Sequence, residues 1–248
     1  MKTSAAVDRL AMRAKPEGSP LMEQVWEDLL FLHWPIEEAL IRPLIPESLE
    51  IDTFEGKAWI GITPFRLTGL RLLSLPPIPG FNAFNEINVR TYVLHHGKPG
   101  IWFLSLDASK LIPAIGARIF FTLPYFSAEI DFAKSDGEFR FDMKRDLASE
   151  TYFYARWKQG ARLRVPDTES LAFFLIERYA LFAEAGGSLS MTRAYHHPWI
   201  LDEAILVSLE STLIAALGLP EPIGEPLAHF SSSPVTVGVW APEIVRSV

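Results

Sequence analysis

The chain has 248 residues, carries a net charge of −7 and contains no cysteine. This acidic balance argues against nucleic-acid binding, which requires a concentrated basic surface. The lack of cysteine excludes disulfides, thiolate metal sites and a cysteine nucleophile, and it fits a cytoplasmic protein. Charges interrupt the apolar stretches before they reach the roughly 18 residues that a membrane span needs, so we expect no membrane segment.

The first predicted segment, residues 1–21, is a flexible lead-in. It is mixed in charge and lacks the apolar centre of a signal peptide. From residue 22 to residue 248 there is no internal repeat and no linker long enough to separate domains. We therefore expect 22–248 to form a single domain.

The first half of the chain is predicted to consist mainly of strands. A strand is expected over 23–34, and Pro35 then opens a short helix, because proline suits the first helical turn. Alternating apolar residues at 48–54 and 57–65 predict a hairpin. A second hairpin turns at 96–98.

The second half alternates strands with short helices. The run 108–121 indicates a short helix or an irregular crossover, and 167–178 is the clearest helix, with Asp167 as its N-cap. Residues 201–219 begin like a strand and end like a helix. Further strands are predicted at 125–132, 138–145, 150–157, 178–185, 188–197 and 229–240. Short strands with regular turn signals favour a β-rich α+β fold, with an antiparallel, barrel-like or sandwich sheet and a few short helices.

One strand carries three polar residues in line, Glu86, Asn88 and Arg90. Their spacing of two places them on one face of the strand, with Ile87 and Val89 on the other. They could form a pocket wall that binds an anionic ligand, since the planar fork of arginine suits carboxylates. They could instead form a solvated face, with a Glu–Arg pair contributing under about 1 kcal/mol. On spacing alone the solvated face is the commoner outcome.

Two further charges, Asp107 and Arg118, flank the run 108–121. Arg118 lies among apolar neighbours, where a charge needs a partner to offset its desolvation. An Asp107–Arg118 pair that holds the crossover and a pair that contacts a ligand are both open interpretations.

Adjacent histidines, His196 and His197, must point to opposite faces of a strand. We expect one of them to pack inside and donate to a carbonyl while the other is exposed, and His197 is a candidate for proton transfer. No HExxH or HxH pattern accompanies them, so no metal site is expected. The nucleophile elbow GxSxG and the nucleotide-binding glycine loops are also absent, and no cofactor is expected.

Several segments of the sequence match a known family in order along the chain. LLFLHWPI, LIPESLEIDTFEGKAWIGITPF, NEINVRTYV, GIWFLSLDAS, GARIFFTLPY, LIERYALF and HHPWIL together resemble the YqjF-like proteins, the uncharacterised DUF2071 family. The resemblance runs from about Trp26 to Trp240. It implies an architecture more than an activity.

That family looks like a distant relative of the acetoacetate decarboxylase-like fold, in which strands close around an interior pocket. GARIFFTLPY resembles the decarboxylase stretch from an arginine to Gly-Tyr-Pro-Lys-Lys, but here Tyr125 is followed by Phe-Ser-Ala. Lys110 lies well upstream and has no adjacent lysine, so Schiff-base decarboxylation is not expected. The resemblance does imply that the three polar strand residues, Arg118 and Tyr125 line a cavity.

Two functions follow as expectations, and catalysis stays an open question. In the first, the protein binds or transforms a small organic acid or carbonyl compound. Arg90 and Arg118 would then hold its anionic or carbonyl end, and Asn88 and Tyr125 would orient it. Glu86 or Asp107 would accept a proton if one is transferred.

In the second, the barrel is filled by its own side chains and the protein is a structural or interaction module. A homodimer is also possible, because sheet edges need cover. Arginines saturated by internal carboxylates would favour the module. Arginines with spare donors in a cavity would favour the ligand.

Overall fold

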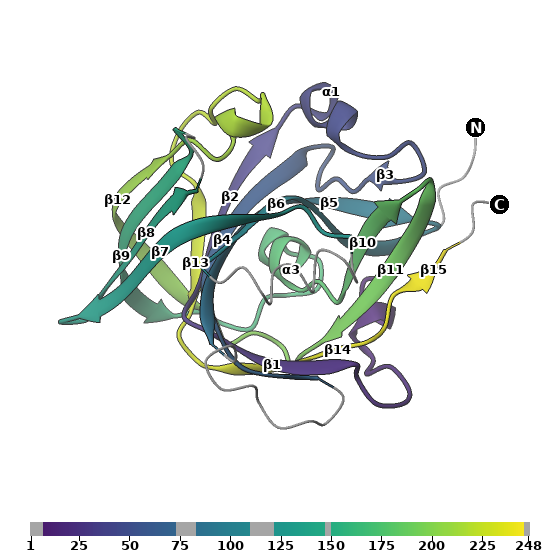
Figure 1. Cartoon of the computed structure of the whole chain (residues 1–248), viewed down its shortest axis with the longest axis horizontal. Helices are drawn as coiled ribbons and strands as arrows, with labels where there is room; N and C mark the ends of the chain where they lie inside the picture. The colour runs from purple at the N-terminus through teal and green to yellow at the C-terminus, as the bar shows by residue number, and fades with distance from the viewer. Residues whose placement is uncertain (1–6, 73–82, 110–121, 147–149, 246–248) are drawn as a thin grey trace.

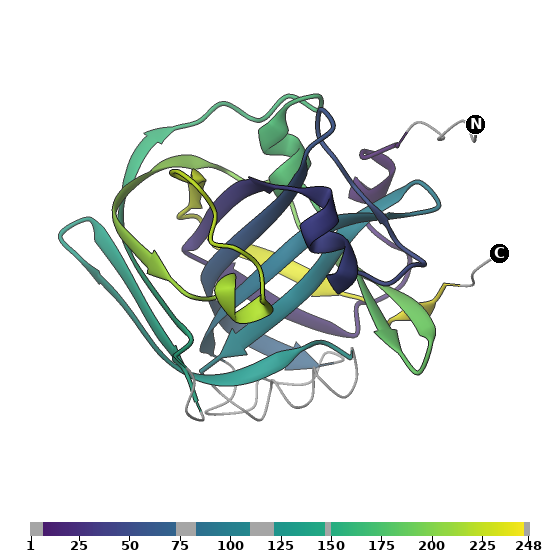
Figure 2. The ribbon, with the colours of Figure 1, turned by 90° about the horizontal axis from the view of Figure 1, so that it is seen from above.

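The computed structural model describes residues 7–72, 83–109, 122–146 and 150–245. Their strands form one 15-stranded sheet that curls back on itself (Figures 1 and 2). Two additional strand pairings, β1 with β4 and β6 with β5, close this sheet into two circuits. The interiors of these circuits are called the first and the second chamber.

Strands from both ends of the chain surround the first chamber. In order around the circuit they are β1 (Met22–Glu27), β14 (Val235–Val239), β11 (Ser188–Tyr195), β10 (Ala180–Ala185), β6 (Lys98–Ala108), β5 (Phe84–His95) and β4 (Ala58–Leu72). Figure 1 shows the short helix α3 (Leu171–Ile176) inside this circuit. The first chamber is therefore closed in part by a helix.

The second chamber shares the wall β4–β5–β6 with the first. Its other strands, in order, are β7 (Tyr125–Ser135), β8 (Glu138–Arg145), β9 (Tyr152–Arg162), β12 (Asp202–Ser211), β13 (Leu227–Ser231) and β2 (Leu29–Ile36). Two short strands lie outside the circuits: β3 (Glu50–Ile51) pairs with β5, and β15 (Glu243–Ile244) pairs with β11. Both faces of the shared wall β4–β5–β6 are therefore buried.

Burial of both faces explains the residue pattern of β5. Ile87 and Val89 belong to a large apolar cluster with Phe139, Trp157 and Phe230, which packs the second chamber. The rings of Phe139 and Phe230 lie 4.6 Å apart in an edge-to-face arrangement, a favourable geometry for aromatic pairs. The alternate residues of β5 point the other way, into the first chamber.

The sequence predicted an antiparallel sheet, but the observed sheet is mixed. Most neighbours are antiparallel, but β6 runs parallel to β7 and to β10. Parallel neighbours need a crossover connection, and the chain between β6 and β7 includes the run 108–121. The predicted helix or crossover there falls mostly on 110–121, outside the described residues.

Several predicted boundaries need correction. Pro35 lies in β2, and helix α1 (Glu38–Ile41) begins three residues later, continuing into the 3₁₀ turn Arg42–Leu44. The predicted strand 23–34 is divided into β1 and β2 at Asp28, whose φ is 52°. The predicted last strand likewise contains both β13 and β14. Residues 201–219 contain β12 and then the 3₁₀ turn Ala215–Leu217, as the mixed pattern indicated.

The described part of the predicted lead-in, residues 7–21, lies against the barrel. It includes the 3₁₀ turn Ala11–Arg13, in which Met12 is buried. Arg193 donates to the carbonyls of Met12 and Ala14, at 2.5 and 2.9 Å. No helix within the described residues is long and apolar enough to cross a membrane.

Helix α3 begins later than the sequence predicted, and its N-cap is Ser170 instead of Asp167. The Ser170 hydroxyl accepts a hydrogen bond from the Phe173 amide at 3.2 Å. Asp167 instead closes the preceding turn, where its carboxylate accepts from the Glu169 amide at 3.0 Å. Both residue types suit an N-cap, so composition alone could not distinguish them.

We expect Ser170→Ala to lower the free energy of unfolding by about 1 kcal/mol, because the Phe173 amide loses its cap. Urea unfolding at neutral pH measures this difference. Glu169→Ala serves as the control, because its side chain makes no described hydrogen bond. Equal stability of the Ser170 variant and wild type would show that the cap contributes nothing.

Candidate functional site

The three polar residues of β5 are buried, which excludes a solvated face. Glu86, Asn88 and Arg90 are 4%, 3% and 7% exposed. Strand alternation points them into the first chamber, while Ile87 and Val89 point into the second. Burial of an acid, an amide and a guanidinium in a row requires compensating partners, because uncompensated burial is costly.

These residues line a cavity of about 60 Å³ in the first chamber. One buried water needs roughly 10–15 Å³ by the same kind of measure, so the space suits a molecule of a few non-hydrogen atoms. Its apolar walls include Phe31, Phe65, Phe103 and Trp199. Mostly apolar walls with a few polar groups are the usual lining of a ligand site.

Arg90 has spare hydrogen-bond donors. Its Nε and Nη2 atoms are buried and have no hydrogen-bond partner. Its guanidinium lies 5.5 Å from the centre of the Phe31 ring, and it forms no ion pair among the described residues. The side-chain oxygens of Asn88 and Thr63, which stands opposite Asn88 on β4, are also buried and unpartnered. The cavity therefore offers donors and acceptors that the described protein does not satisfy.

Glu86 is an acid whose neutral form is favoured. Its pKa is raised from 4.5 to about 8, mainly by burial and to a smaller extent by the nearby Asp107 charge. A hydrogen bond from the Tyr125 hydroxyl to Glu86 Oε2, 2.8 Å long, acts in the opposite direction. At pH 7 the side chain is therefore mainly a carboxylic acid, able to donate a hydrogen bond. Burial and the Glu86 charge raise the pKa of Tyr125 well above its usual value, so it stays protonated.

Asp107 does not join this site. It stands opposite Ile87 in the β5–β6 register and so faces the second chamber. There Arg145 binds it with two hydrogen bonds, Nε to Oδ1 at 2.6 Å and Nη2 to Oδ2 at 2.8 Å. Burial raises the pKa of Asp107, and the bonds from Arg145 oppose this effect. Asp107 is thus part of an internal ion pair with Arg145, and Arg118, its predicted partner, lies outside the described residues.

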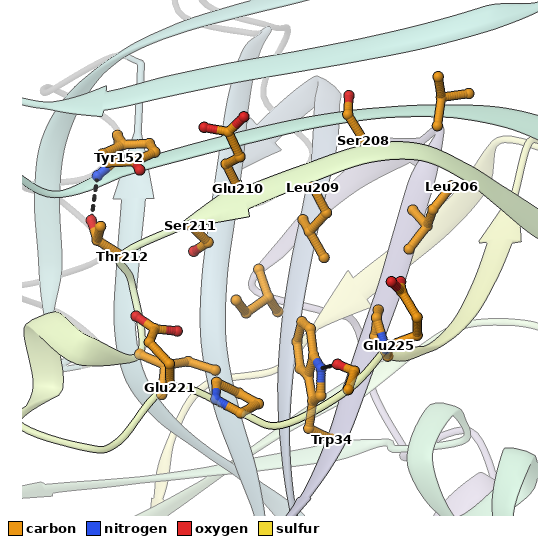
Figure 3. Close-up of a pocket in the computed structure, with 16 residues that line it drawn as sticks. Trp34, Tyr152, Leu206, Ser208, Leu209, Glu210, Ser211, Thr212, Glu221 and Glu225 are labelled. Atoms are coloured by element: carbon orange, nitrogen blue, oxygen red, sulfur yellow. Dashed lines mark hydrogen bonds between the residues drawn. The ribbon is translucent and has the colours of Figure 1, made fainter.

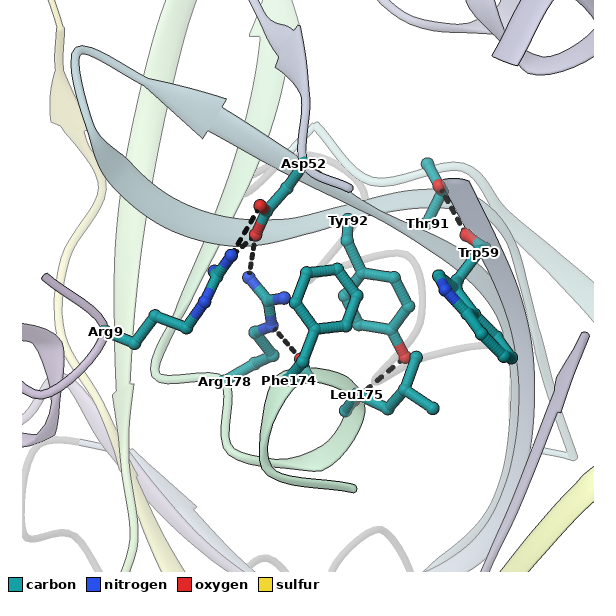
Figure 4. Close-up of polar contacts among 8 residues, drawn as sticks. All are labelled: Arg9, Asp52, Trp59, Thr91, Tyr92, Phe174, Leu175 and Arg178. Atoms are coloured by element: carbon teal, nitrogen blue, oxygen red, sulfur yellow. Dashed lines mark hydrogen bonds and ion pairs between the residues drawn. The ribbon is translucent and has the colours of Figure 1, made fainter. Parts of the chain in front are cut away.

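A second guanidinium, that of Arg178, lines the same cavity. Figure 4 shows its polar contacts. Its Nε donates to the Phe174 carbonyl at 2.7 Å, and its Nη1 donates to Asp52 Oδ2 at 2.7 Å. Arg9 also binds Asp52, at 2.6 and 2.7 Å, so one buried carboxylate serves two arginines. Burial lowers the pKa of Arg178, and Asp52 opposes this shift. The Nη2 atom of Arg178 remains buried and unpartnered.

Of the two adjacent histidines, His196 lines the cavity and His197 is exposed. One ring nitrogen of His196 lies 2.8 Å from the His197 carbonyl oxygen and the other 3.3 Å from that of Arg178. One buried and one exposed histidine were expected, and this division is confirmed. His197 was the wrong choice as a cavity residue, because strand alternation could not decide which of the two points inward.

A larger cavity, of about 620 Å³, lies between β12 and the β2–β4 wall (Figure 3). Trp34, Ile62 and Leu209 contribute apolar surface, and the Trp34 indole donates to the Gly224 carbonyl at 3.2 Å. Its carboxylates, those of Glu210, Glu221 and Glu225, are exposed. The smaller cavity is the better candidate site, because buried charges without partners mark functional sites more often than exposed ones do.

Sequence reasoning missed Arg178 as a cavity residue. It follows α3, and its bond to the Phe174 carbonyl is the interaction expected of an arginine at the C-terminal end of a helix. Arg178 reaches the cavity because α3 lies inside the barrel. The burial of this helix could have been inferred from its apolar run Phe173–Ile176, which is buried throughout.

Comparison with known proteins agrees with the family resemblance. The model of the DUF2071 family, described as an uncharacterized conserved protein, matches residues 23–234. The uncharacterized protein YqjF of Bacillus subtilis is 41% identical over 216 residues, which span 87% of this chain and 89% of that protein.

Solved structures with the same fold include two related kinds of enzyme. Acetoacetate decarboxylase from Legionella pneumophila matches with a TM-score of 0.64 at 13% identity, covering 99% of this chain and 98% of that chain. The enduracididine biosynthesis enzyme MppR, solved with pyruvate, matches with a TM-score of 0.62 at 11% identity, covering 93% and 92%. At these identities the likeness shows the fold alone. The predicted β-rich, acetoacetate decarboxylase-like fold is confirmed.

Proposed function

We propose that this chain, which belongs to the DUF2071 family, binds a small organic acid with a carbonyl group in the first chamber, without forming a Schiff base. Arg90 would hold the carboxylate. Arg178 and Asn88 would contact the remaining polar atoms, and Glu86 would donate a hydrogen bond to the carbonyl oxygen. The ligand class is that of short 2-oxo and 3-oxo acids.

Arg90 carries this proposal. Its buried guanidinium has two unpartnered nitrogens and no carboxylate partner among the described residues, whereas Asp107, Asp52 and Glu86 all have polar partners. An uncompensated buried charge is costly, and an anionic ligand would offset that cost with charge-assisted hydrogen bonds. The small volume of the cavity, about 60 Å³, favours a ligand of a few carbon atoms.

Glu86 supports the carbonyl part of the proposal. A carboxyl group that stays neutral at pH 7 can donate a hydrogen bond to a carbonyl oxygen, which a carboxylate cannot do. Because Tyr125 donates to Oε2, the acid proton is left to Oε1. Such a donor would stabilise negative charge that develops on a carbonyl oxygen, as in an enol or enolate.

The positions of the lysines favour binding without a covalent bond between the ligand and a lysine amine. No lysine of the described residues lines the cavity. The MppR structure with pyruvate shows that a protein of this fold accommodates a small 2-oxo acid. In this chain we assign the corresponding task to guanidinium and carboxyl groups.

The alternative, a module with a filled barrel, draws support from the Asp107–Arg145 pair, which is internal and fully bonded. The spare donors of Arg90 favour the ligand instead. Aromatic side chains pack part of the second chamber, which also borders the larger cavity, and the first chamber contains the cavity lined by Arg90.

Titration calorimetry with acetate, pyruvate, acetoacetate and neutral acetone tests the proposal. We expect the oxo acids to bind more tightly than acetate, and acetone to bind least. Arg90→Gln should weaken oxo-acid binding by tenfold or more, because hydrogen bonds to charged groups contribute about 1.5–3 kcal/mol. It should not lower the free energy of unfolding, since Arg90 has no internal ion pair to lose.

Arg140→Gln is the matched control, because Arg140 is exposed and, among the described residues, forms an ion pair only with the exposed Asp131. Its binding should equal that of wild type. Equal binding of pyruvate and acetone, or unchanged binding after Arg90→Gln, would contradict the proposal. A fold that collapses without Arg90 would favour the structural module.

A further inference from the structure

A buried histidine, His33, lies next to the arginine of the candidate site. It is on β2, where it is 1% exposed. The strand register places it opposite Gly61 of β4, and Gly61 stands opposite Arg90 of β5. Opposed residues in a sheet share a face, so His33 and Arg90 face the same chamber on either side of a residue without a side chain.

The His33 ring occupies the space over Gly61. A Cβ atom added to Gly61 would lie 2.8 Å from His33 Cδ2 and 3.1 Å from Nε2, closer than packed atoms allow. Gly61 does not have the positive φ that would itself require glycine. Glycine at position 61 therefore leaves room for the His33 imidazole on the side of the sheet that also carries Arg90.

Neither ring nitrogen of His33 has a hydrogen-bond partner in the described segments of the chain. Its near neighbours are aromatic: the Phe31 ring is stacked at 6.4 Å and the Tyr92 ring lies at 6.1 Å. Burial, followed by the charge of Arg90, lowers the pKa of His33 well below its usual value, so the ring is neutral. An unsatisfied buried polar group costs about 1–3 kcal/mol, and a phenyl ring would pack in this place without that cost.

His33 and Arg90 have complementary hydrogen-bonding groups that lack partners. A neutral imidazole has one acceptor nitrogen, and Arg90 Nε and Nη2 together carry three N–H groups without acceptors. No direct bond joins them in this structure. One buried water between them, or a small rotation of the guanidinium, would satisfy both residues.

We propose that His33 is a positioning residue, which accepts a hydrogen bond from the Arg90 guanidinium and orients it toward the bound carboxylate. The inference rests on the proposed function and adds the residue that fixes the geometry of the arginine. Arginine binds carboxylates well only when its planar fork is aligned, so the orientation of Arg90 affects affinity directly.

His33→Phe is the test, with pyruvate as the probe and two readouts that should move in opposite directions. The melting temperature should stay equal or rise, because the variant removes two unsatisfied nitrogens and keeps an aromatic ring. The dissociation constant for pyruvate should rise by about tenfold, the effect of one lost hydrogen bond to a charged group. His33→Gln, which keeps an acceptor, should recover part of the affinity.

Each other result decides against the inference. A lower melting temperature of His33→Phe, with unchanged pyruvate affinity, would show that His33 is structural. Wild-type affinity in a stable His33→Phe would overturn the inference alone and leave the carboxylate site intact. Absence of pyruvate binding in wild type would overturn the proposed function and this inference together.

Discussion

Asp52→Ala should lower the free energy of unfolding by about 3–5 kcal/mol, the usual effect of removing one partner from a buried ion pair. Asp52 is 2% exposed and binds both Arg178 and Arg9 (Figure 4). Within the part of the chain that the structure describes, its removal leaves the buried Arg178 guanidinium with only the Phe174 carbonyl as a hydrogen-bond partner. Urea unfolding monitored by tryptophan fluorescence gives the difference.

Asp131→Ala is the matched control for an aspartate–arginine pair. Its carboxylate is 66% exposed and pairs with the exposed Arg140, so the expected loss is below about 1 kcal/mol. If Asp52→Ala lost no more stability than Asp131→Ala, Arg178 would have to find other compensation in the interior. The assignment of Arg178 to a tightly fixed position beside the cavity would then be wrong.

Glu86→Gln should make the free energy of unfolding less dependent on pH. The variant should become more stable than wild type as the pH rises. In the folded protein Glu86 keeps its proton up to about pH 8, while its ordinary pKa is 4.5. Unfolding therefore releases a proton between these values, and stability falls as pH rises through this window. The full difference corresponds to roughly 4–5 kcal/mol, because one pKa unit equals about 1.4 kcal/mol.

Urea unfolding of both proteins at pH 5 and pH 9 measures this effect. Near pH 5 the variant and wild type should be similarly stable, and at pH 9 the variant should be the more stable of the two. Glu138→Gln is the control: Glu138 is part of a surface ion-pair group with Arg156, so its substitution should not produce that pattern. A constant difference between wild type and Glu86→Gln at both pH values would show that Glu86 is already ionised at pH 5.

Strand periodicity predicted the polar row of β5 but not its environment. The spacing of Glu86, Asn88 and Arg90 fixed their common face, and this face is buried because β4, β5 and β6 form a wall between two chambers. Period-two alternation looks the same on a half-exposed strand and on a strand with one polar chamber. The family resemblance supplied the distinction, because it implied an interior cavity.

Ion pairs between residues far apart in the chain could not be predicted from the sequence. Asp107 pairs with Arg145, which is 38 residues away and is brought near by the parallel pairing of β6 with β7 and by the β7–β8 hairpin. Arg178 meets Asp52 across 126 residues. Neither pair has a local pattern, since both depend on how the circuits close. Local features such as the hairpin at 96–98 were predicted correctly, because turn chemistry acts over a few residues.

The central claim is that the first chamber binds a small oxo acid through Arg90. A crystal structure of the protein soaked with pyruvate tests it most directly. We predict density for pyruvate in the cavity, with its carboxylate within hydrogen-bond distance of Arg90 Nε and Nη2, and no covalent bond to a lysine. Pyruvate bound only in the larger cavity beside Trp34, or joined to a lysine, would contradict the claim.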